Sequence, residues 1–94
     1  MKQKDILVRL SKLLKDKGAK KVAVFGSYVR GEEKPESDID VIVEFSIRKS
    51  LLDLVIIERE LTEALGIKVD LLSEKSISPY MINAIKREMK VIYS

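Results

Sequence analysis

The spacing of apolar and polar residues along the chain predicts three helices and three strands. Apolar side chains recur every three or four positions in the helical stretches, and short β-branched runs bounded by Gly, Pro or Ser mark the strands. The predicted helices are residues 2–17, 51–65 and 79–90, and the predicted strands are residues 20–25, 38–45 and 67–72. Helices and strands interleaved in this order form one α/β domain, which we expect to span residues 1–94.

The predicted helices carry start and stop signals. Ser50 and Asp53 stand three residues apart, as in a capping box, and Ser78 precedes Pro79 as an N-cap precedes a first-turn proline. Gly66 follows the last periodic residue of the 51–65 helix, where a helix commonly ends. These signals place the boundaries of two helices more sharply than the periodicity does.

The 51–65 helix has more apolar residues than one core-facing stripe requires. Leu52 and Ile56 fall beside Arg59 and Glu63, outside the main apolar arc, so they predict either an interface or ordinary exposed residues. The arc expected to face the sheet consists of Leu51, Leu54, Val55, Ile57, Leu61, Ala64 and Leu65. In the last helix, core packing is expected for Met81, Ile82, Ile85 and Met89.

The composition excludes several kinds of chemistry. The 94 residues include neither Cys nor His, which rules out disulfides, thiolate and imidazole metal sites and Ser-His-Asp triads. Lys and Arg number 18 and Asp and Glu 15, and the net charge of +3 is too small for a dedicated nucleic-acid binder. No apolar run approaches the roughly 20 residues of a membrane span, and no signal-peptide pattern opens the chain, so we expect a cytoplasmic protein.

Three features carry candidate chemistry. Asp38 and Asp40 stand two apart on a predicted strand, so their side chains share one face and suit a hard cation such as Mg²⁺. Gly26 and Ser27 follow a strand end, where glycine permits close backbone approach and the serine hydroxyl supplies a donor for a phosphate. Asp70 interrupts an otherwise apolar strand, in which Asp is uncommon.

Each feature alone has a plainer interpretation. The paired aspartates can simply be solvated at a strand end, Asp70 can pair with Lys68, and Gly26-Ser27 can be a tight turn. Together they predict a nucleoside triphosphate site, in which Asp38 and Asp40 bridge two metal ions and Asp70 holds one ion and accepts a proton.

The arrangement of these residues resembles a known superfamily. Gly26-Ser27, ten intervening residues, Asp38-Ile39-Asp40 and a later Asp70 are similar to the signature of the DNA polymerase β-like nucleotidyltransferases. More narrowly, the stretch GSYVRGEEKPESDIDVIVEF resembles the minimal nucleotidyltransferase (MNT) family, which includes the MntA-type antitoxins of HEPN/MNT toxin–antitoxin systems.

The resemblance implies a fold and a reaction. The fold is the nucleotidyltransferase fold, α/β (α+β), with a small mixed β-sheet of three to four strands and helices packed on one side. The reaction is transfer of AMP from ATP, with two Mg²⁺ ions, to a hydroxyl (a Tyr) of a partner HEPN ribonuclease toxin. The resemblance assigns catalysis and metal binding to Asp38, Asp40 and Asp70, and nucleotide binding to Gly26, Ser27 and Arg30.

Two alternatives stay open. The chain can be a binding module that neutralises its partner by masking, or it can transfer the nucleotide to a small molecule or an RNA. Arg30 can equally form an ion pair instead of contacting a triphosphate. A chain of this length leaves little room for an acceptor-binding domain, so acceptor specificity is expected to come from a partner protein or a second copy in a homo- or hetero-oligomer.

Overall fold

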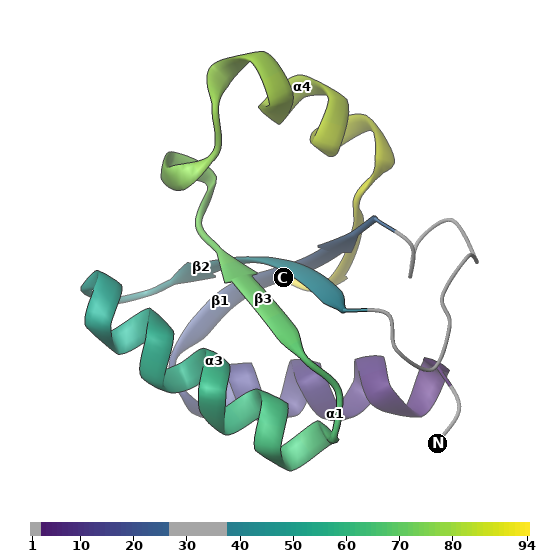
Figure 1. The fold of residues 1–94 in the computed structure, drawn as a ribbon, viewed down its shortest axis with the longest axis vertical. Helices are drawn as coiled ribbons and strands as arrows, with labels where there is room; N and C mark the ends of the chain where they lie inside the picture. Colours follow the sequence, from purple (N-terminus) through teal and green to yellow (C-terminus); the bar gives the residue numbers. More distant parts are fainter. Residues whose placement is uncertain (1–2, 27–37) are drawn as a thin grey trace.

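The computed structural model describes residues 3–26 and 38–94. Among these residues the chain forms four strands, three α-helices and one short 3-10 helix, η1 (Figure 1). In chain order they are α1 (Gln3–Asp16), β1 (Ala19–Phe25), β2 (Ile39–Phe45), α3 (Leu51–Leu65), β3 (Val69–Leu72), η1 (Glu74–Ser76), α4 (Pro79–Glu88) and β4 (Lys90–Tyr93). The predicted helices and strands are all present, and β4 follows where the last helix was expected to continue.

The four strands form one mixed sheet in the order β3-β2-β1-β4. β1 is antiparallel to both β2 and β4, whereas β2 and β3 are parallel. A parallel pair requires a crossover connection, and here α3 supplies it. The sheet confirms the expected mixed architecture, and it places β3 at one edge and β4 at the other.

The hydrophobic core lies between one face of the sheet and the helices α1 and α3 (Figure 1). Alternate residues of β2 and β3 point into it, so that Ile39, Val41 and Val69 are fully buried, and Leu10 and Leu61 meet them from the two helices. The guanidinium of Arg9 donates a hydrogen bond of 3.1 Å to the Ala64 carbonyl and thereby links α1 to α3. Two of the three described helices, α1 and α3, thus pack on one side of the sheet as expected, and α4 is the exception (Figure 1).

Helix α4 lies over the opposite face of the sheet (Figure 1) and has no buried residue. The prediction of core packing was wrong for Met81, which is 59% exposed. Ile82, Ile85 and Met89 are half-buried. The helical spacing of apolar residues identifies a helix and its apolar face, but how deeply that face is buried depends on how closely the helix approaches the sheet.

The predicted capping signals of α3 are confirmed. The Asp53 backbone N–H donates to the Ser50 hydroxyl, the Ser50 backbone N–H donates to the Asp53 carboxylate, and both bonds measure 3.1 Å. These bonds from Ser50 hold the pKa of Asp53 below its usual value, because they stabilise the charged carboxylate. At the other end Gly66 adopts a left-handed conformation, with φ of 71°.

The orientation of α3 differs from the predicted one. Ile57, Leu61 and Leu65 face the core as expected, but Leu51 is 77% and Val55 59% exposed. The predicted apolar arc is wider than the strip that the sheet covers, because the sheet contacts one side of the helix only. None of the helices within the described residues is long and apolar enough to span a membrane.

Candidate active site

Two of the candidate aspartates lie side by side on the sheet. β2 and β3 pair in a register that sets Asp40 opposite Asp70, and the preceding pair is Ile39 and Val69. Ile39 and Val69 are fully buried against the helices, so alternation turns Asp40 and Asp70 to the other face, where both are half-buried. Neighbouring strands are about 4.8 Å apart, which brings two negative charges close together.

The backbone of Gly26 lies against the Asp40 carboxylate. It follows Phe25, whose partner across the sheet is Asp40, and its backbone φ is +76°. A Cβ atom added at position 26 would lie 2.5 Å from Asp40 Oδ2. Both the left-handed backbone and this close approach therefore require glycine. The sequence predicted a close approach of Gly26 to a phosphate, which stays a prediction, whereas the close approach in the structure is to the Asp40 side chain.

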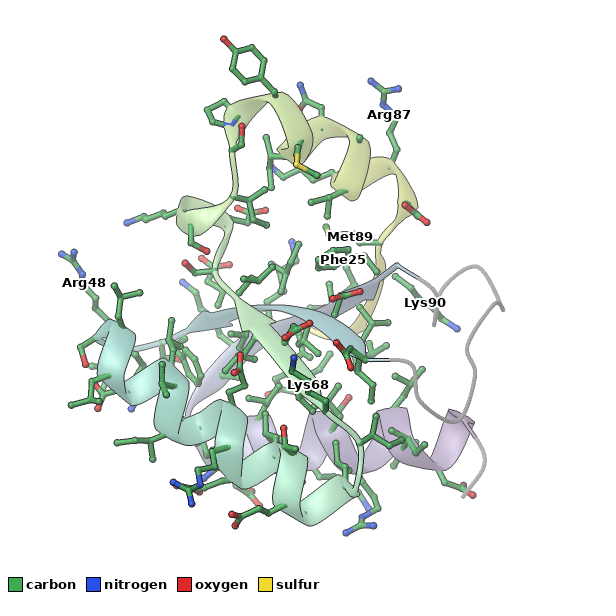
Figure 2. All side chains as sticks on the ribbon, viewed as in Figure 1. Phe25, Arg48, Lys68, Arg87, Met89 and Lys90 are labelled. Carbon is green, nitrogen blue, oxygen red and sulfur yellow. The ribbon has the colours of Figure 1, made fainter. Side chains whose placement is uncertain are left out.

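Asp38 joins this end of the sheet through an ion pair. Its carboxylate Oδ2 lies 3.8 Å from Nζ of Lys68, which projects at the start of β3 (Figure 2). The backbone N–H of Ile39 donates to the Lys68 carbonyl at 2.9 Å, and so ties the two strand starts together. Lys68 had been considered as the ion-pair partner of Asp70, whereas the structure pairs it with Asp38. An exposed pair of this length is worth up to about 1 kcal/mol.

Two α3 side chains, not anticipated from the sequence, hold the strand that carries Asp70. The Val69 N–H donates to Thr62 Oγ1 at 3.1 Å, and the Leu71 N–H donates to Glu58 Oε2 at 2.8 Å. β3 is an edge strand, so these outward N–H groups have no neighbouring strand to accept their hydrogens. The two acceptors lie four residues apart and so share one face of the helix. This spacing is visible in the sequence, but its role becomes clear only from the way α3 packs against β3.

The nucleotide-binding predictions for Ser27 and Arg30 lie outside the described residues and stay predictions. Within the described part of the chain, no three acidic side chains approach closely enough to hold a metal ion as they stand. The donor chemistry nevertheless suits Mg²⁺, because carboxylate oxygens are its preferred protein ligands and Asp40 and Asp70 share a row of the sheet. Closure of all three aspartates around two ions stays a prediction.

Comparison with known proteins identifies the family. The model of the nucleotidyltransferase domain family matches residues 2–92. The chain belongs to the nucleotidyltransferase domain family. The match confirms the superfamily that the signature predicted, and the chain is a nucleotidyltransferase.

Relatives of similar length share much of the nucleotidyltransferase sequence. One from Methanocaldococcus jannaschii is 45% identical over 84 residues, covering 89% of this chain and 90% of the relative. The protein adenylyltransferase MntA of Thermococcus cleftensis is 39% identical over 85 residues, covering 89% and 86%.

Solved structures share the nucleotidyltransferase fold. A toxin–antitoxin crystal structure with AMP-PNP contains a chain that superposes with a TM-score of 0.84 at 26% identity, covering 94% of this chain and 73% of that one. An MNT antitoxin in complex with a tri-AMPylated HEPN toxin of Shewanella oneidensis gives a TM-score of 0.80. Its identity is 23% and its coverage 99% and 73%, so this second likeness concerns the fold.

Proposed function

We propose that this nucleotidyltransferase transfers AMP from ATP to a hydroxyl, in the first instance a tyrosine, of a partner HEPN ribonuclease toxin and thereby acts as its antitoxin. The observation that carries the proposal is the pairing of Asp40 with Asp70 on the sheet face opposite the core, with Gly26 against the Asp40 carboxylate. The 39% identity to a protein adenylyltransferase, MntA, supports a protein acceptor.

The reaction needs an acceptor oxygen in line with the α-phosphorus. The hydroxyl oxygen would attack the α-phosphorus, the bond to the bridging oxygen would break, and pyrophosphate would leave. The hydroxyl proton would pass to the Asp70 carboxylate, which reaches this face from β3. Ser27 and Arg30 would bind the phosphates by virtue of the family signature.

The acidic face requires positive charge before a triphosphate can bind there. Two Mg²⁺ ions, when bound, would neutralise the phosphates and make the hydroxyl more acidic. Asp38 and Asp40 would hold both ions and Asp70 one of them. The close approach of Gly26 to Asp40 supports this assignment, because a side chain at position 26 would displace the carboxylate.

The loose packing of α4 over the sheet face that carries Asp40 and Asp70 favours a protein acceptor over a small molecule. Helix α4 stands over it without burying any of its own residues, and Tyr80 at its start is 95% exposed. A small-molecule enzyme usually encloses most of its ligand in a pocket. Among the described residues, the large open cleft lined by Arg48, Ser50, Leu54 and Ser76 lies at the other end of β2 and away from Asp40.

The test is transfer of label from ATP carrying ³²P at the α-position to the purified partner toxin in the presence of Mg²⁺. The wild-type chain should label the toxin, whereas ATP labelled at the γ-position should not. The double variant Asp38→Asn with Asp40→Asn should abolish labelling. Glu44→Gln is a matched control, because Glu44 lies on the same strand face, four residues beyond Asp40, and pairs with Lys20.

Labelling that survives the double variant would contradict the assigned roles of Asp38 and Asp40. A separate arm measures toxin activity on RNA in the presence of the double variant. If the inactive variant still neutralises the toxin at equal stoichiometry, the masking alternative replaces catalysis as the antitoxin mechanism.

A further inference from the structure

A cleft opens at the end of the sheet opposite to the one that carries Asp40. It has a volume of about 890 Å³ and lies between the last residues of β2, the first turn of α3 and residues 73–76, which include η1. We call it the α3–η1 cleft. β2 and β3 are parallel, so both strands direct their carboxyl ends toward it. The proposed metal ligands Asp38, Asp40 and Asp70 lie outside it.

The acidic side chains that line the α3–η1 cleft already have partners. Glu44 and Glu74 each form an ion pair of 3.4 Å with a lysine outside the cleft, and Asp53 is held in the capping box of α3. The negative charges of the cleft are therefore satisfied within the fold.

The basic side chains of the cleft lack such partners. Arg48, Lys49 and Lys75 line it, and none of them forms an ion pair with any residue that the structure describes. Arg48 projects outward from the amino-terminal end of α3 (Figure 2), and Lys49 stands 5.7 Å from the centroid of the Phe45 ring. Three uncompensated positive charges around one cleft attract an anionic ligand and raise its local concentration.

The apolar part of the cleft indicates which kind of anion fits. Leu51, 77% exposed, and the half-buried Leu54 line the cleft together with the three cations. A peptide with acidic and apolar side chains matches such a surface, because complementary charge steers it and an apolar anchor adds affinity. Single-stranded nucleic acid usually stacks its bases on open aromatic faces. Among the described lining residues the one aromatic side chain is Phe45, and Lys49 already lies over its ring, so the cleft favours a peptide.

We propose that the α3–η1 cleft binds an acidic segment of the protein that accepts AMP. Carboxylates of that segment contact Arg48, Lys49 and Lys75, and an apolar side chain of the segment packs against Leu51. This docking site rests on the proposed function, because it gives the acceptor protein of that reaction a second contact with the chain.

The distance between the two contacts suits a protein acceptor. Asp40 and Phe45 lie five residues apart on β2, which separates them by about 17 Å at about 3.3 Å per residue. A folded protein can span that distance and still present a hydroxyl to the acidic face, whereas a small-molecule acceptor cannot. The cleft would thus select the acceptor without touching the reacting atoms.

Binding can be measured apart from catalysis by isothermal titration calorimetry. The purified partner toxin is titrated into the chain with Asp38→Asn and Asp40→Asn, in which the proposed reaction is blocked. Adding Arg48→Glu with Lys75→Glu should weaken binding about fivefold to fiftyfold, because two exposed ion pairs are replaced by repulsion.

Two matched controls separate the cleft from general effects of charge and hydrophobicity. Lys12→Glu with Arg59→Glu changes the net charge equally at exposed positions outside the cleft and should leave the dissociation constant unchanged. Leu51→Ser should weaken binding about threefold to thirtyfold. Ile47→Ser should not, because Ile47 is 76% exposed but lies outside the cleft. Thermal unfolding followed by circular dichroism checks that each variant is folded, as expected for exposed positions.

Initial rates of AMP transfer test whether the docked protein is the acceptor. In the chain that keeps Asp38 and Asp40, Arg48→Glu with Lys75→Glu should raise the KM for the toxin and leave kcat unchanged, because the cleft is remote from the reacting groups. A chain that binds the toxin through the cleft but transfers no AMP to it would contradict the proposed function and support the docking site.

Three results would overturn the docking site. The first is a toxin that does not bind the chain, or binds the Arg48→Glu with Lys75→Glu variant as tightly as the unsubstituted cleft. The second is an equal loss of binding in the Lys12→Glu with Arg59→Glu control. The third is labelled oligo(U) that binds the chain more tightly than the toxin does and is released by the cleft substitutions, which would make RNA the occupant.

Discussion

The Cα atom of Gly26 lies so close to the carboxylate of Asp40 that any side chain at position 26 would collide with it. A Cβ there would stand 2.5 Å from Asp40 Oδ2 and 3.5 Å from Asp40 Cγ. This contact links the end of β1 to the second aspartate of the signature, whose neighbour across the sheet on β1 is Phe25. The glycine thus fixes where the carboxylate can be.

Replacing Gly26 by alanine should impair catalysis out of proportion to its effect on stability. The variant has to displace the Asp40 carboxylate, so we expect AMP transfer to fall by at least about tenfold. The left-handed backbone adds a cost of about 1–2 kcal/mol in free energy of unfolding. Initial rates of label transfer and thermal unfolding measure the two effects.

Gly66→Ala provides the matched control. Gly66 has φ of 71°, close to the 76° of Gly26, but nothing lies within 4 Å of its added Cβ. It should lose similar stability and keep its activity. Equal losses of activity in both variants would show that backbone strain, and not the contact with Asp40, explains the first result.

Replacing Asp70 by asparagine should separate stability from activity. The change removes one of two like charges that face each other across the β2–β3 pair. In Mg²⁺-free buffer the free energy of unfolding should therefore rise by about 0.2–1 kcal/mol. AMP transfer should fall at least about 100-fold, because the proposed proton acceptor is lost. Glu44→Gln, which removes a charge from the same face of β2, should produce neither effect.

Weakening the hydrogen bonds between α3 and the edge strand β3 should lower stability and speed local amide exchange. Glu58→Gln and Thr62→Val weaken the hydrogen bonds that α3 accepts from the N–H groups on either side of Asp70. Each change should reduce the free energy of unfolding by about 0.5–2 kcal/mol. Amide hydrogen exchange should accelerate at Val69 in the Thr62 variant and at Leu71 in the Glu58 variant. Unchanged exchange in both would show that α3 does not restrain β3.

The capping box of α3 should make stability depend on pH in the acid range. The pKa of Asp53 is lowered in the folded state by the hydrogen bonds from Ser50, so its contribution to stability is complete above its ordinary value of 3.8. That contribution should disappear as the pH falls through the folded-state pKa. Melting temperatures of the wild type and Asp53→Asn should therefore differ at pH 7 and converge near pH 2. A constant difference would contradict the assignment.

The local features of the chain could be predicted because they depend on residues close in sequence. The helix periods, the Ser50–Asp53 cap and the Ser78–Pro79 start all appear at the expected positions. Asp40 lies on β2 as predicted, whereas Asp38 directly precedes the strand, which begins at Ile39. The burial of α4 could not be predicted in the same way, because it depends on the distance between α4 and the sheet, and the spacing of apolar residues along a helix carries no information about that distance.

The sequence by itself determined three helices and three of the four described strands, the absence of Cys and His chemistry, and the nucleotidyltransferase signature, since these are properties of neighbouring residues or of composition. Only the tertiary structure decided that β3 lies parallel to β2 in the register that joins Asp40 to Asp70. It also decided that Glu58 and Thr62 hold β3, and that Leu51 and Val55 face outward. Strand register and helix rotation result from packing between segments far apart in the chain, and no local spacing encodes that packing.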